Sequence, residues 1–353
     1  MPRHSARLFL AAPLLLVGVG VAGCGHTEIG SFTPVVQDTA FLAGEPLRLT
    51  YSDGRDRTPG WSTATGRIVY AFDNSYTSRN LPKGCVGDLP LSGGSREWEL
   101  CDTDAQRVDT STVGLWPALR SDGAVALVRQ RWPLIGLAPY YSDLAVRPPS
   151  PSALPVKVLP IPYFSGGRSH QGVAYLQWLD DTRLVWLGQG VIRSTLDNVE
   201  SGYDINILDL VDTAAGITVV PGTDYASSVA RGGNADTLYY TLGGDSLVYR
   251  RTLSTGAVDT VYDFGALRIA RDVQVKNGRL TAVVGGSVSW GPHATLGMAQ
   301  YDNGGPVYAV DLPAGAPVLV TQTYDLYRHP VLSPDGAFVV AEQFNDLWRI
   351  ALP

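Results

Sequence analysis

One stretch near the end of the chain decides the fold: His329-Pro330-Val331-Leu332-Ser333-Pro334-Asp335-Gly336-Ala337-Phe338-Val339-Val340, followed by Asn345-Asp346-Leu347-Trp348-Arg349-Ile350. Its centre, Ser333 to Gly336, predicts a tight turn, because proline presets φ at the second turn position and glycine supplies a positive φ. β-Branched, aliphatic and aromatic residues on both sides predict two strands, and the second run predicts a third. The stretch therefore predicts an antiparallel meander that ends shortly before Pro353.

The same pair of strands around a turn recurs along the chain. The copies are residues 60–70, 116–127, 176–186, 228–240, 273–283 and 329–340. A third strand is predicted after each copy, at residues 86–91, 143–146, 204–210, 246–249, 306–310 and 346–350. A turn and a fourth strand follow five of them, as in residues 210–220 and 253–262. Six units of this kind predict an all-β, six-bladed β-propeller of four-stranded blades.

The sixth unit has no fourth strand, whereas residues 47–50 form a strand pattern without a partner near the N-terminus. An open ring would expose unpaired strand edges, which natural sheets avoid. We therefore predict that the N-terminal strand joins the C-terminal blade and closes the ring through backbone hydrogen bonds. The predicted propeller covers residues 44–353.

Three motifs carry a resemblance to a known family. They are Ser121-Asp122-Gly123, Ser333-Pro334-Asp335-Gly336 and Asp346-Leu347-Trp348-Arg349-Ile350. They resemble the WD-like repeats of TolB-type six-bladed propellers over roughly residues 45–353, and the second and sixth units fit best. TolB has a separate α/β domain before its propeller, for which this sequence leaves no room. The resemblance therefore implies the fold and does not extend to TolB's binding of a peptidoglycan-associated lipoprotein.

The N-terminus predicts export and lipid attachment. Arg3, His4 and Arg7 precede an apolar segment, residues 8–21, that is short for a membrane span. Val21-Ala22-Gly23-Cys24 then resembles a bacterial lipobox, in which cleavage precedes the cysteine and lipid joins its sulfur. We predict a signal peptide over residues 1–23, and lipidated Cys24 with a tether over residues 24–43. An ordinary cleaved signal or a signal anchor is the alternative. Gly25 after Cys24 favours sorting to the outer membrane, facing the periplasm or the surface.

Cys85 and Cys101 are the two cysteines that remain. They flank a strand, a Gly-Gly turn and a second strand, so they are expected to face each other near the open end of a hairpin. An exported chain meets an oxidising compartment, which favours a structural disulfide between them. Closing so short a loop stabilises by about 3 kcal/mol in the chain-entropy model. A metal site is the competing role, but no histidine or second cysteine pair lies nearby.

Composition excludes some partners. The net charge is −6, only 17% of the residues are charged, and no basic cluster is present. Nothing therefore predicts binding to nucleic acid or to anionic lipid, and membrane association is expected through the lipid anchor only. We expect a monomer.

The sequence offers little for catalysis. The histidines have no metal-ligand spacing, and no Gly-x-Ser-x-Gly elbow occurs. His329 is interpreted as a packing residue, and Ser169 beside His170 as part of a glycine-rich loop, because neighbours on a strand point apart. Six aspartates recur, and most of them lie in the predicted hairpin turns, where a carboxylate is expected to hydrogen-bond backbone N–H groups: Asp53, Asp56, Asp122, Asp180, Asp181 and Asp335.

Aromatic residues gather in four predicted insertion loops, residues 73–83, 129–141, 188–202 and 285–305. The candidate binding residues are Tyr76, Trp132, Tyr140, Tyr141, Trp290, His293 and Tyr301. Aromatic loops at one end of a rigid ring suit a surface that binds a glycan or an envelope protein, although these side chains equally suit packing under their own loops. The leading hypothesis is a non-catalytic binding scaffold without a cofactor. The alternative is a propeller hydrolase or lactonase with a metal such as Ca²⁺ in the central channel.

Overall fold

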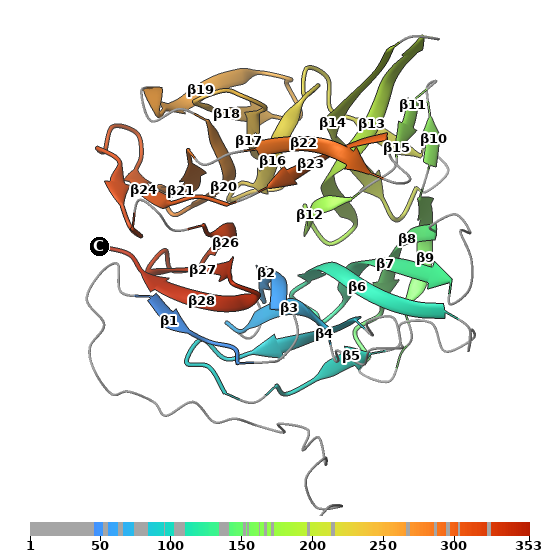
Figure 1. The fold of residues 1–353 in the computed structure, drawn as a ribbon, viewed down its shortest axis with the longest axis horizontal. Coiled ribbons are helices and arrows are strands. Elements are labelled where there is room, and N and C mark those ends of the chain that lie inside the picture. Colours follow the sequence, from blue (N-terminus) through green and yellow to red (C-terminus); the bar gives the residue numbers. More distant parts are fainter. Residues whose placement is uncertain are drawn as a thin grey trace, which may run out of the picture. The chain divides into compact units, whose positions relative to one another are not determined.

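The chain forms a β-propeller, a ring of six blades (Figure 1). The computed structural model describes residues 46–353 apart from short internal stretches, of which the longest are residues 74–83, 102–109 and 134–140. The described residues form antiparallel strands and no α-helix, and thus include no helix suited to crossing a membrane. The predicted all-β, six-bladed propeller is confirmed. Cys24 and the predicted signal and tether lie outside the described residues.

Each blade is a four-stranded antiparallel sheet whose strands follow one another from the centre of the ring outward. The first blade contains β2 (Asp56–Trp61), β3 (Ile68–Asp73), β4 (Gly84–Leu89) and β5 (Glu99–Cys101). The second contains β6 (Thr110–Leu119), β7 (Val125–Pro133), β8 (Tyr141–Arg147) and β9 (Val156–Ile161). The third contains β12 (Ala174–Trp178), β13 (Arg183–Thr195), β14 (Asn198–Asp209) and β15 (Ile217–Val219). Two short strands, β10 (Tyr163–Ser165) and β11 (Arg168–His170), extend the third sheet through the end of β13.

The remaining blades follow the same order. The fourth contains β16 (Ala226–Arg231), β17 (Thr237–Leu242), β18 (Leu247–Thr252) and β19 (Val258–Asp263). The fifth contains β20 (Ala270–Lys276), β21 (Arg279–Val284), β24 (Val307–Asp311) and β25 (Val318–Leu319), with a hairpin of β22 (Val288–His293) and β23 (Gly297–Asp302) inserted after β21. The sixth contains β26 (Arg328–Leu332), β27 (Phe338–Gln343), β28 (Asp346–Ala351) and β1 (Pro46–Arg48).

The sixth blade takes its outer strand from the N-terminal part of the chain, seen in Figure 1 as blue β1 beside red β28. Leu47 lies opposite Arg349 in this antiparallel pair, and the Leu49 N–H donates to the Leu347 carbonyl at 2.8 Å. Arg48 also forms an ion pair with Asp346, with 2.7 Å between Nη2 and Oδ2. The strand begins at Pro46, one residue before the predicted start at Leu47.

The inner strands surround the centre of the ring. Each of β2, β6, β12, β16, β20 and β26 contacts the inner strands of both neighbouring blades. An apolar cluster fills the space between every two adjacent blades; Trp178 and Trp186, for example, lie between the second and third. Burial of these faces contributes about 25 cal/mol per Å² of apolar surface, so blade-to-blade packing holds the inner strands in place.

The predicted hairpin turns are confirmed. Gly336 has a φ of +76°, and its N–H donates to the Ser333 carbonyl at 2.9 Å. The Asp335 carboxylate accepts the Ala337 N–H at 3.0 Å, and the Ser333 hydroxyl and this N–H hold the pKa of Asp335 below its usual range. At the equivalent turn, the hydrogen bond from Arg120 lowers the pKa of Asp122 to about 2.

Not every one of the six aspartates lies in a described turn. Asp56 lies outside the turns, fully buried in β2. Asp53 lies outside the described residues.

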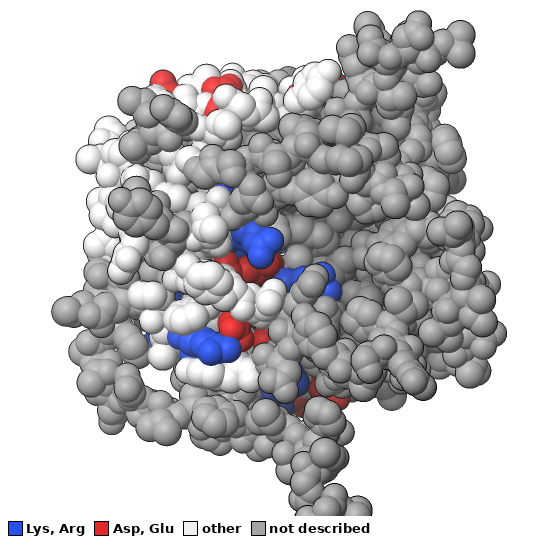
Figure 2. Space-filling view, viewed as in Figure 1, with Lys and Arg blue, Asp and Glu red and all other residues white. Residues whose placement is uncertain are grey.

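On the face seen in Figure 2, the described Lys and Arg side chains lie among Asp and Glu, so they form no patch of one sign there.

Candidate functional site

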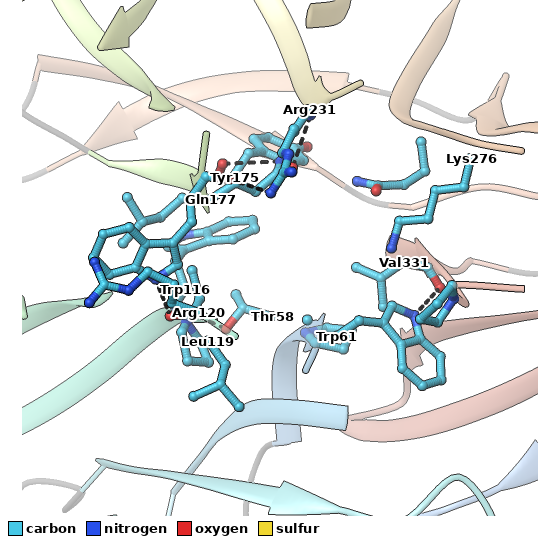
Figure 3. A pocket seen from close by; sticks show the side chains of 18 of the residues that line it. Thr58, Trp61, Trp116, Leu119, Arg120, Tyr175, Gln177, Arg231, Lys276 and Val331 are labelled. Atoms are coloured by element: carbon cyan, nitrogen blue, oxygen red, sulfur yellow. Dashed lines mark hydrogen bonds between the residues drawn. The ribbon is translucent and has the colours of Figure 1, made fainter. Parts of the chain in front are cut away.

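A cavity of about 580 Å³ lies at the centre of the ring, at the end where the inner hairpins turn. All six inner strands contribute to its lining through residues such as Trp61, Trp116, Tyr175, Arg231, Lys276 and Val331 (Figure 3). Turn residues of the second to sixth blades surround the mouth, among them Asp181, Gly233 and Pro334. A cavity of this size suits a small molecule or one residue of a larger ligand.

The floor of this central pocket depends on an unusual backbone feature. Every inner strand has a β-bulge in its pairing with the next strand of its blade. In five bulges one residue has a left-handed φ between 48° and 55°: Thr58, Trp116, Tyr175, Asp272 and His329. Bulky and β-branched residues rarely adopt this conformation, and such strain concentrates at functional sites. The bulges therefore mark the centre of the ring as a specialised region.

The side chains at these bulges meet across the ring. The Trp116 ring centroid lies 4.9 Å from that of Tyr175 and 4.7 Å from that of His329. The Tyr175 hydroxyl donates to Asp272 Oδ1, and the His329 N–H donates to Asp272 Oδ2 at 3.1 Å. The Trp116 N–H donates to Thr58 Oγ1 at 3.2 Å. Residues from five blades thus form one hydrogen-bonded and aromatic floor.

A buried carboxylate supports this floor from beneath. Glu342 of β27 is 6% exposed, and it accepts a hydrogen bond from the Thr58 N–H. Its Oε1 lies 2.7 Å from His329 Nδ1. Burial by itself raises the pKa of Glu342, but the charge and hydrogen bond of His329 and the Thr58 N–H outweigh it and leave the pKa lowered. Glu342 therefore links the first and sixth blades as an ionised carboxylate.

Indole rings in rigid positions line the walls. Trp61 Nε1 donates to the Val331 carbonyl at 3.3 Å, and Trp178 Nε1 donates to the Ala118 carbonyl at 2.9 Å. Arg120 lies over the Trp178 ring at 4.6 Å and pairs with Asp122 at 2.6 Å. Because both indoles bond to a neighbouring blade, the aromatic walls are already ordered without a ligand.

Two cations line the pocket on the fourth and fifth blades. Figure 3 shows Lys276 extending from β20 toward the cavity, and Arg231 lies at the end of β16. The guanidinium of Arg231 is 3.4 Å from the Trp178 carbonyl. Burial, with a smaller contribution from the charge of Arg231, lowers the pKa of Lys276 to about 8. The cavity therefore combines aromatic walls with two cations on adjacent blades.

The predicted aromatic surface lies elsewhere. Trp132 and Tyr141 belong to β7 and β8, Trp290 and His293 to β22, and Tyr301 to β23. The prediction that these five stand in loops is wrong, because β7 and β8 continue into one insertion and β22 and β23 form a separate hairpin in another. Their segments leave the blades at the end opposite the hairpin turns that surround the pocket. Tyr76 and Tyr140 lie outside the described residues. A binding role for this group stays a prediction.

Two further predictions concern the pairing of Cys85 with Cys101 and the segment that contains Ser169 and His170. Cys85 lies directly opposite Cys101 in the pair formed by β4 and β5, the position that a bridge across a hairpin requires. The disulfide itself stays a prediction. Ser169 and His170 lie in β11, so the predicted glycine-rich loop is wrong: this segment pairs with β10 and β13.

Sequence reasoning misses most of the pocket residues. Trp116 and His329 occupy equivalent positions before a proline, and Thr58 before Pro59 is a third case. This X-Pro pattern at the inner strand is a signal that marks three of the bulges. Tyr175 and Asp272 carry no such signal.

The metal alternative finds no support in the described residues, since no group of three or more His, Cys, Asp or Glu side chains there could hold an ion. Asp272 and Glu342 instead bond to Tyr175, His329 and backbone N–H groups.

Comparison with known proteins identifies the fold. No protein-family model and no curated protein matches the sequence. The structure is similar to a gluconolactonase from Xanthomonas campestris, with 12% identity and a TM-score of 0.52 over 87% of this chain and 89% of that one. It is also similar to TolB from Acinetobacter baumannii, with 14% identity and a TM-score of 0.51 over 82% of this chain and 64% of TolB. These similarities show the β-propeller fold.

Proposed function

We propose that this protein is a non-catalytic binding module whose propeller takes up its ligand, a glycan or a segment of an envelope protein, in the central pocket. The observation that carries the proposal is the 580 Å³ cavity, to which all six blades contribute and whose walls contain ordered indoles. Preordered aromatic walls reduce the entropic cost of binding. The central pocket replaces the aromatic insertions as the leading candidate site.

A variant that obstructs the mouth tests this proposal. Gly233 lines the pocket, has no positive φ, and leaves open space around an added Cβ. Gly233→Trp should therefore fold normally while blocking entry. Gly243→Trp is the matched control, because Gly243 is exposed on the same blade and a Cβ there meets nothing closer than 3.4 Å.

The measurement is binding of cell-wall glycan and peptide fragments by the purified full chain, followed by calorimetry and tryptophan fluorescence. We expect at least one fragment to bind the parent and Gly243→Trp with similar affinity, and Gly233→Trp at least tenfold more weakly. Equal binding by all three proteins would place the ligand outside the pocket.

We also propose that the protein is anchored to the bacterial cell envelope through lipid on Cys24. The support is the lipobox-like Val21-Ala22-Gly23-Cys24 after an apolar segment. Cys24→Ser should move the protein from the membrane fraction to the soluble fraction, because one apolar segment of this length without lipid anchors poorly. The measurement is membrane fractionation with immunoblotting. Unchanged membrane association would remove the lipid-anchor proposal.

A hydrolase is the second candidate, favoured by one observation. His329 lines the pocket with Nδ1 beside the buried Glu342, an arrangement typical of a general base held by a carboxylate. An enzyme of this kind should hydrolyse a simple aldonolactone with saturation kinetics, and His329→Gln should abolish turnover while Gly243→Trp retains it. No turnover by the parent would remove the candidate.

A further inference from the structure

Lys276 and Arg231 differ from Arg120, the other arginine that lines the pocket. Arg120, Arg183 and Arg279 each form an ion pair with an aspartate. Among the described residues, the Lys276 ammonium has no hydrogen-bond or ion-pair partner, and the Arg231 guanidinium donates only to a carbonyl. The pocket thus contains two cations on adjacent blades whose charge no carboxylate of the described residues balances.

The positive charges of Lys276 and Arg231 are partly buried and repel each other. Lys276 is only partly exposed, and the charge that acts most on it is that of Arg231. Half-buried like charges destabilise a fold, and natural proteins retain such an arrangement mainly where function requires it. An anion bound between the two side chains would offset the cost of burying their charges and the repulsion between them. The arrangement therefore indicates a ligand that brings negative charge.

The residues around Lys276 indicate where the negative charge of the ligand would bind. Gln274 lies two residues before Lys276 on β20, so both side chains project to the same, pocket-facing side of the strand. The acids of the mouth, Asp180 and Asp181, belong to the third blade, and Asp180 already pairs with Arg183 at 2.6 Å. Asp180 is therefore already balanced by a cation other than Lys276 and Arg231.

Resting on the proposed function, we propose that Lys276 and Arg231 bind an anionic oxygen group of the pocket's ligand, a carboxylate or a phosphate. A guanidinium binds such a group with two parallel hydrogen bonds, and an ammonium adds a point charge. The remainder of the ligand then lies against the indole of Trp61, which lines the same pocket. Only the charged group is assigned to the two cations.

Three matched ligands test this assignment: glucose, glucuronate and glucose 6-phosphate, which share one pyranose ring and differ in charge. Inorganic phosphate alone is the fourth. Calorimetry of the purified full chain at low and high salt should show glucuronate or glucose 6-phosphate binding at least tenfold more tightly than glucose, less so at high salt. The stronger of the two distinguishes a carboxylate from a phosphate ligand.

Substitutions of the two cations show whether the anion binds to them. Lys276→Met and Arg231→Gln should each weaken binding of the anion by about 10- to 100-fold, as expected for a charge-assisted hydrogen bond. The exposed Lys157→Met on β9 and Arg250→Gln on β18 are matched controls and should bind as the parent does. Lys276→Met should also melt at a higher temperature than the parent at pH 7, which shows that it folds.

The outcomes separate the two proposals. Equal binding of glucose and its anionic forms, blocked by Gly233→Trp but unaffected in Lys276→Met, would overturn the anion assignment and retain the pocket as a binding site. Failure of all four ligands to bind at millimolar concentration would also overturn the assignment. Anion binding that persists in Gly233→Trp would place the anion outside the pocket and overturn the anion assignment.

Discussion

Deleting residues 44–54 is expected to lower the melting temperature of the whole propeller by about 10 °C, although the segment contributes only one short strand. The deletion removes β1 and leaves the edge of β28 unpaired. It also removes Leu49, which is 2% exposed and packs in the cluster between the sixth and first blades. Loss of one buried leucine alone costs about 2–5 kcal/mol. The Thr50 hydroxyl, which accepts the Leu347 N–H at 2.9 Å, is lost as well.

The matched control is a deletion of equal length, residues 30–40, in the predicted tether. That protein should melt as the parent does, and Leu49→Ala should fall between the two. The measurement is thermal unfolding followed by circular dichroism or calorimetry. A full-length melting temperature after deletion of residues 44–54 would refute the argument that this strand stabilises the ring.

The fold could be predicted because its signals are local. The turn at Ser333 to Gly336 and the alternation of apolar residues around it appear within a dozen residues, and five further copies reinforce the interpretation. The loop predicted for residues 188–202 is wrong for the opposite reason. Residues 188–202 contain glycines that suggest a loop, yet β13 and β14 continue through them as a long hairpin, because each strand pairs with the other over its whole length.

The pocket could not be predicted in the same way, since each blade contributes only a few residues to it. A bulge interrupts the two-residue period on which strand prediction depends, so the inward direction of Trp116 or Asp272 cannot be inferred from alternation. Lys276 and Arg231 likewise lie on separate strands, and only the ring brings them to one cavity. Local pattern therefore predicts the scaffold, while the site depends on how the blades assemble.

Replacing Glu342 by alanine is expected to destabilise the propeller by about 3–5 kcal/mol at pH 7, the usual cost of removing one partner of a buried ion pair. His329 Nδ1 and the Thr58 N–H would both lose their acceptor, so the junction of the first and sixth blades would weaken together with the pocket floor. Glu342→Gln keeps the side-chain volume and one acceptor and should cost less. Glu99→Gln is the control, because Glu99 is exposed and its nearest cation is 3.9 Å away.

The pH dependence of this effect follows from the lowered pKa of Glu342. Near pH 4 the unfolded chain binds a proton at this carboxyl and the folded chain does not, so ionised Glu342 stabilises the fold at neutral pH and loses that contribution as the pH falls through its folded pKa. The difference in unfolding free energy between the parent and Glu342→Gln should therefore be largest near pH 7 and shrink below about pH 4. Urea unfolding at both pH values measures it. A difference that stays constant with pH would mean that Glu342 acts through its size and hydrogen bonds, and that its charge does not hold the floor in place.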